Sequence, residues 1–137
     1  MPDEINEPNE PLWPAVDTIP SAKRASMFGV AAAGLEALYS AFVALDPLIP
    51  GSVKAGSVDP WMLTAAMLMA VVAVGIYRES RFAVVAGLLL FILSRAAALV
   101  AASVFSPLTA LLIFAILLGY IHAMRGVFAL HVLRRGG

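Results

Sequence analysis

The stretch ASMFGVAAAGLEALYSAFVAL, residues 25–45, decides the fold of this chain. It contains 21 residues and only one charged side chain, Glu36. About 20 apolar residues are enough for a helix to cross the hydrocarbon core of a bilayer. A helix on the surface of a soluble domain needs a polar stripe, and this stretch has none. The stretch therefore predicts a transmembrane helix.

Three further apolar stretches follow, and each has roughly the length that a membrane span requires. Ser106-Pro107 separates the last two, because proline is favoured in the first turn of a helix. Strands of outer-membrane barrels are about 9–11 residues long and alternate in polarity, and these stretches do not alternate. The sequence predicts an all-α polytopic membrane protein, a four-transmembrane-helix bundle with spans near 25–45, 60–77, 82–104 and 108–132.

Residues 1–24 differ from the rest because they hold five of the nine acidic side chains and five of the nine prolines. A segment of that composition buries too little apolar surface to offset the entropy lost when a chain is ordered. We predict a flexible acidic cytoplasmic tail over residues 1–24, followed by a membrane domain over residues 25–137.

Composition excludes several classes of function. The 137 residues are 61% hydrophobic and 13% charged, whereas a soluble domain is about 25% charged. No basic patch alternates with aromatic residues, so nucleic acid is not an expected partner. The chain has no cysteine, no phosphate-binding loop and no hydrolase or zinc-protease motif. We therefore expect no enzymatic activity, no catalytic residues, no cofactor and no metal site.

Lysine and arginine near the span ends set the orientation, because they accumulate on the cytoplasmic side. In the loops of the predicted bundle, one side receives only Lys54. The other side receives six basic residues, which are Lys23, Arg24, Arg78, Arg81, Arg134 and Arg135. The sequence predicts a multi-pass protein of the cell membrane, which here means an inner membrane. Both termini are expected on the cytoplasmic side.

Two opposite charges fall at nearly the same depth inside the predicted bundle. Glu36 lies 12 residues after Arg24, about 18 Å along a helix, and Arg95 lies 14 residues after Arg81, about 21 Å. A charge at the bilayer centre costs about 2.5–3.5 kcal/mol even on lenient scales, so such residues find partners. We predict an intramembrane ion pair between Glu36 and Arg95, whose role is either to fix helix register or to serve transport.

Three other residues are candidates for a proton relay with this pair. Histidine is a common proton carrier in proteins, which makes His122 a candidate, and Tyr39 follows Glu36 by one helical turn. Arg125 lies about two turns from the inner interface. A haem on His122 would need a second ligand from another span, where only methionines are available, so we expect none.

Small residues at a spacing of four mark the first span, at Ala25, Gly29, Ala33, Ala37 and Ala41. Membrane helices associate through such residues, either within one bundle or between copies. The leading hypothesis is therefore a small membrane protein without enzymatic activity, an accessory subunit or oligomeric helix-packing scaffold. Its partners would be the lipid bilayer and either further copies of itself or another membrane protein. The alternative is a small proton-linked transporter or channel that uses Glu36, Arg95 and His122.

The segment Ala31-Ala-Ala-Gly-Leu-Glu36 in a short four-span chain resembles the small multidrug resistance transporters. In that family a glutamate in the first span binds protons and cationic drugs in competition, so the resemblance implies that role for Glu36. The chain departs from the family pattern in its acidic tail, in Arg95, and in lacking the glycine-rich or tryptophan signature of the third span. The family is therefore not assigned.

Overall fold

The structure is a computed structural model that describes residues 15–51, 57–101 and 106–136. Within these ranges all regular secondary structure is helical. The chain forms four long helices, and a short 3-10 turn, η1 (Asp46–Leu48), follows the first of them. The long helices are α1 (Ile19–Leu45), α2 (Pro60–Tyr77), α3 (Arg81–Ala101) and α4 (Pro107–Arg135).

Helix α1 begins six residues before the predicted start at residue 25. The hydroxyl of Thr18 accepts a hydrogen bond from the backbone N–H of Ser21, and the Ser21 hydroxyl accepts one from the N–H of Thr18. This capping box, with Pro20 in the first turn, starts the helix. Residues 19–24, which we had assigned to the tail, are thus helical, and Ala22 is fully buried. The tail residues 1–14 lie outside the described residues.

The other helix limits follow local sequence signals. The carboxylate of Asp59 accepts hydrogen bonds from two backbone N–H groups at the start of α2, which covers the predicted range 60–77. Ser106 caps α4 in the same way through the N–H of Thr109. Helix α4 is a few residues longer than predicted, whereas the predicted end of α3 at residue 104 lies outside the described residues.

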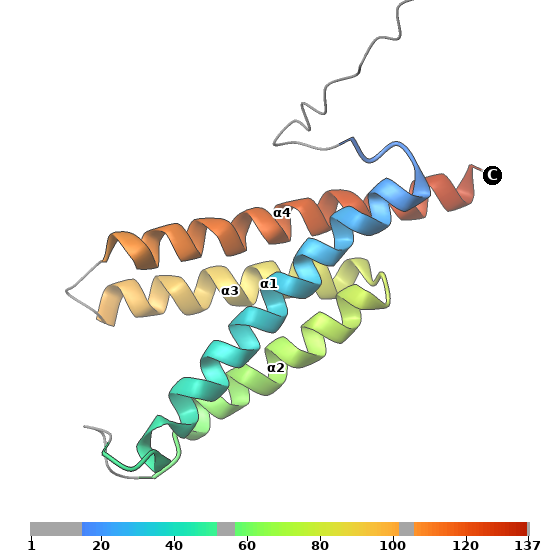
Figure 1. Cartoon of the computed structure of the whole chain (residues 1–137). Coiled ribbons are helices and arrows are strands. Elements are labelled where there is room, and N and C mark those ends of the chain that lie inside the picture. The colour runs from blue at the N-terminus through green and yellow to red at the C-terminus, as the bar shows by residue number, and fades with distance from the viewer. Residues whose placement is uncertain (1–14, 52–56, 102–105, 137) are drawn as a thin grey trace, which may run out of the picture.

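Helices α1 and α2 form one hairpin and α3 and α4 form another, as Figure 1 shows. The start of α1 and the end of α4 meet at one end of the molecule, together with the turn between α2 and α3. Toward the other end the two hairpins diverge, so that the last turns of α1 lie apart from the first turns of α4 (Figure 1). The bundle is therefore closed at one end and splayed at the other.

The contact between α1 and α4 is made of small residues. A Cβ atom built on Gly126 would lie 2.4 Å from the carbonyl oxygen of Ala22, and one built on Gly29 would lie 2.2 Å from the Cβ of Ala123. One built on Gly119 would lie 2.9 Å from the Cβ of Ala32. The two backbones touch almost directly, as in other membrane helix pairs joined by small residues. We call this contact the α1–α4 seam.

The small residues of the first span thus serve the interior of the chain. Ala25, Gly29 and Ala33 are buried against the other helices, whereas Ala37 and Ala41 are half-buried. The choice that the sequence left open, between internal packing and contact with another copy, is resolved in favour of internal packing for these three positions.

Three helical segments of the described chain are long and apolar enough to cross a membrane: Ile19–Leu48, Pro60–Tyr77 and Pro107–Arg135. Helix α3 is not among them, so the four-span arrangement stays a prediction. Large apolar side chains cover the outer surfaces of the helices, with Trp61 83% exposed at the start of α2. An outer surface of this kind suits lipid rather than water.

The turn between α2 and α3 is stabilised by a backbone motif and by an ion pair. Glu79 has a φ of 62°, in the left-handed region that glycine favours. Its N–H donates to the carbonyl of Ile76, and the N–H of Ser80 donates to that of Gly75, which forms a Schellman motif. The Glu79 carboxylate accepts two hydrogen bonds from the guanidinium of Arg134 and so joins this turn to the end of α4.

Candidate functional site: a buried ion pair beside an apolar pocket

Glu36 lies on the inward face of α1, where it is 4% exposed. Its neighbours along that face are small, because Ala32 and Ala33 precede it by one turn and Ser40 follows it by one turn. These small side chains let the other helices come close to α1, and this close approach buries the Glu36 carboxylate.

Arg95 reaches Glu36 from α3. Its Nη2 atom donates a hydrogen bond to Oε1 of Glu36, and the two side chains form an ion pair. The guanidinium carbon also lies 5.5 Å from the ring centre of Tyr39 and 5.4 Å from that of Phe91. Aromatic faces attract cations, so the two rings stabilise the guanidinium where water is scarce. The two side chains are thus paired in the structure, and the position of the pair inside a membrane stays a prediction.

The ion pair does not use the full capacity of the arginine. Its Nε atom is buried and has no hydrogen-bond partner among the described residues, and the Arg95 side chain as a whole is 19% exposed. A guanidinium fork can bind a carboxylate with two parallel bonds, but only one is formed here. The carboxylate is therefore more deeply enclosed than the guanidinium, with 6% of its side chain exposed.

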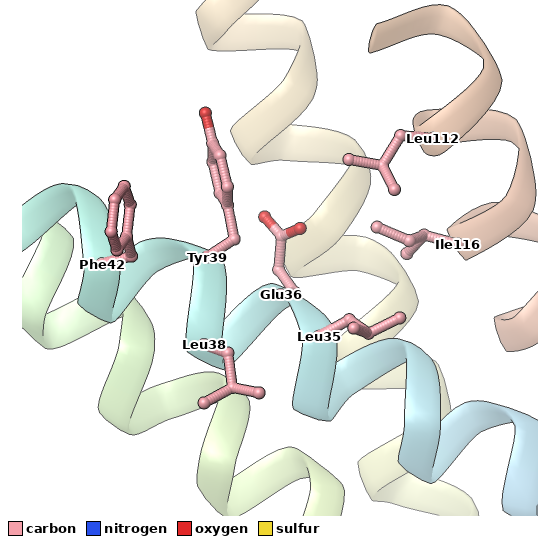
Figure 2. A pocket seen from close by; sticks show the side chains of 7 residues that line it. All are labelled: Leu35, Glu36, Leu38, Tyr39, Phe42, Leu112 and Ile116. Carbon is pink, nitrogen blue, oxygen red and sulfur yellow. The ribbon is translucent and has the colours of Figure 1, made fainter. Parts of the chain in front are cut away.

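A pocket of about 330 Å³ opens next to the carboxylate, between α1 and the first turns of α4. Figure 2 shows that its walls come from these two helices, with Glu36 between them. Five of the seven lining residues are apolar: Leu35, Leu38, Phe42, Leu112 and Ile116. Tyr39 is the other polar residue, and its ring rises from α1 with Glu36 between it and Leu112 (Figure 2).

His122 and Arg125 lie in another part of the molecule. The Nδ1 atom of His122 lies 2.8 Å from the carbonyl oxygen of Leu118, so Nδ1 carries a proton that it donates one turn back along α4. Its ring centre is 5.7 Å from that of Phe28, which precedes Glu36 by eight residues, or about 12 Å along α1. Arg125 is half-buried on α4, further toward the closed end. Of the candidates, the structure gathers Glu36, Arg95 and Tyr39.

Two features of the site were not found by sequence reasoning. Phe91 precedes Arg95 by one helical turn, a spacing that allows the ring to meet the guanidinium. The pocket gave no usable signal, because apolar pairs such as Leu112 and Ile116 recur throughout every membrane helix.

Among the described residues no group of three or more histidine, cysteine, aspartate or glutamate side chains is placed to hold a metal ion. Comparisons with protein families, with curated proteins and with solved structures found no match for this chain.

Proposed function

We propose that the chain is a four-span protein of the cell membrane, with both termini cytoplasmic, that acts through helix packing and catalyses no reaction. It would serve as an accessory subunit of a membrane complex or as the scaffold of a homo-oligomer. The observation that carries this proposal is the Glu36–Arg95 ion pair, in which a buried carboxylate is neutralised by a guanidinium of the same molecule.

The chemistry of the pair supports a packing role. A carboxylate that is already bound to a guanidinium of the same molecule offers no uncompensated charge to a cationic substrate. The α1–α4 seam supports the same role, because direct backbone contact leaves no room for a water-filled path along the seam. Both features join helices, and neither offers an open binding site to a polar substrate.

A proton-linked transporter or channel that uses Glu36, Arg95 and His122 is the second candidate. The observation in its favour is that the pocket reaches the Glu36 carboxylate from outside the bundle. Its weakness is that the pocket walls are almost wholly apolar, because an apolar cavity stays dry and does not conduct protons through water.

Cysteine labelling tests the membrane arrangement, and the natural chain provides a cysteine-free background. The cells are first stripped of their outer layers, with the cell membrane left intact, and are then treated with a membrane-impermeant maleimide. Ser57→Cys and Leu108→Cys are expected to be labelled. Arg78→Cys and Gly136→Cys should be labelled only after the membrane is opened, because they follow α2 and α4 on the cytoplasmic side. Labelling of Leu108→Cys only in opened membranes would mean that α3 does not cross.

Reconstitution separates the two functions. We expect the purified chain in nanodiscs to have the mass of a defined homo-oligomer or of a one-to-one complex with one membrane protein. We also expect proteoliposomes to show no proton flux above empty vesicles between pH 5 and pH 8. A flux that Glu36→Gln abolishes, with Glu79→Gln as the matched control at the closed end, would overturn the packing role.

A further inference from the structure

The pocket beside Glu36 is continuous with the outer surface of the helices. Leu38 is 70% exposed, Phe42 is 63% exposed and Leu112 is 48% exposed, and all three also line the pocket. The pocket therefore opens onto the surface that we assign to lipid. It lies in the part of the bundle where the hairpins diverge (Figures 1 and 2).

The lining of the pocket makes water a poor occupant. Water needs two to four polar partners, and among the described lining residues only Tyr39 and the ion-paired Glu36 have polar side chains.

We propose that the pocket binds one acyl chain of a membrane lipid. A hydrocarbon chain is narrow, carries no polar group that the apolar walls would leave without a partner, and is present at high concentration wherever the bundle meets lipid. The volume lies within the range of about 300–1,000 Å³ that is usual for small-molecule sites. When the acyl chain is buried against leucine, isoleucine and phenylalanine, it makes dispersion contacts that are absent from an empty pocket.

The bound chain would also act on the ion pair. It covers the side of Glu36 that faces the pocket and keeps water from the carboxylate. Exclusion of water lowers the local dielectric constant and so strengthens the attraction between Glu36 and Arg95. The lipid is thus a structural ligand of the splayed half of the bundle. This inference rests on the proposed membrane location and is independent of the accessory role.

Native mass spectrometry of the protein released from nanodiscs of dioleoylphosphatidylcholine tests the proposal. At collision energies that strip the surrounding lipid, the natural chain is expected to keep one lipid per protein. Leu112→Trp, which fills the pocket, is expected to keep none. Leu111→Trp is the matched control and should behave as the natural chain does, because Leu111 is 65% exposed and does not line the pocket.

Ile116→Phe is a second filling variant, one turn further along α4, for use if Leu112→Trp changes the helix content. The proposal would be overturned if the natural chain released all its lipid, or if both filling variants kept as much lipid as the natural chain does. If that result came together with the expected cysteine labelling, the lipid site would fall while the membrane arrangement stood.

Discussion

Replacing Gly126 with alanine is expected to lower the free energy of unfolding by about 1–3 kcal/mol, the usual cost of overpacking a filled core. The added Cβ would lie 2.4 Å from the carbonyl oxygen of Ala22 and 2.6 Å from the backbone nitrogen of Ser26. Both atoms belong to the backbone of α1, which cannot rotate aside as a side chain does. The two helices must therefore move apart along the α1–α4 seam, and the loss should fall at the upper end of the range.

Gly34→Ala is the matched control, because a Cβ at Gly34 meets nothing within 4 Å. Alanine is the better helix former by about 0.5–1 kcal/mol, so this variant should be neutral or slightly more stable. The measurement is thermal unfolding in one detergent, followed by circular dichroism. Equal melting temperatures for Gly126→Ala and Gly34→Ala would show that the seam is not as close as described.

The second large effect is expected from breaking the Glu36–Arg95 ion pair. Glu36→Gln and Arg95→Gln should each lower the free energy of unfolding by about 3–5 kcal/mol, because each leaves one charge buried without its partner. The double variant should cost much less than the sum of the two, since it removes both charges. Arg95 is partly exposed, so Glu36→Gln, which leaves the arginine unpaired, should cost nearer the lower figure, and Arg95→Gln, which leaves the more deeply buried carboxylate unpaired, nearer the upper one.

The ion pair between Glu79 and Arg134 is the control for the effect of burial. It joins the same two chemical groups, but the Arg134 side chain is 54% exposed, and exposed pairs contribute about 0–1 kcal/mol. The two double-mutant cycles, measured under identical conditions, should therefore show strong coupling at Glu36–Arg95 and weak coupling at Glu79–Arg134. Additive effects at Glu36 and Arg95 would contradict a stabilising role for their contact.

The helices and the ion pair were accessible from the sequence because each depends on nearby residues or on simple geometry. The start of α2 follows from the capping residue Asp59 and from Pro60. Glu36 and Arg95 meet because their helices start from the same end and place them at similar distances from it. The start of α1 was missed because the acidic, proline-rich composition of residues 1–24 outweighed the local capping signal of Thr18 and Ser21.

The pocket and the placement of His122 were not accessible, because they depend on how the helices cross. The crossing of α1 and α4 is set by which small residues meet, and glycine and alanine are frequent along both helices. Many registers satisfy a pattern of small residues equally well, and only three-dimensional packing selects one. A register shifted by one turn would change which α4 side chains face Glu36 and which face Phe28.

The close approach of α1 and α4 also constrains how this protein can move. Two backbones in direct contact have no rotatable groups between them, so neither helix can slide or roll past the other without losing the contact. Helices α2 and α3 meet the core partly through longer side chains, such as Met69 and Phe91, which have alternative rotamers. Any rearrangement is therefore expected mainly in α3, which packs least closely against the other helices, around a spine that includes α1 and α4.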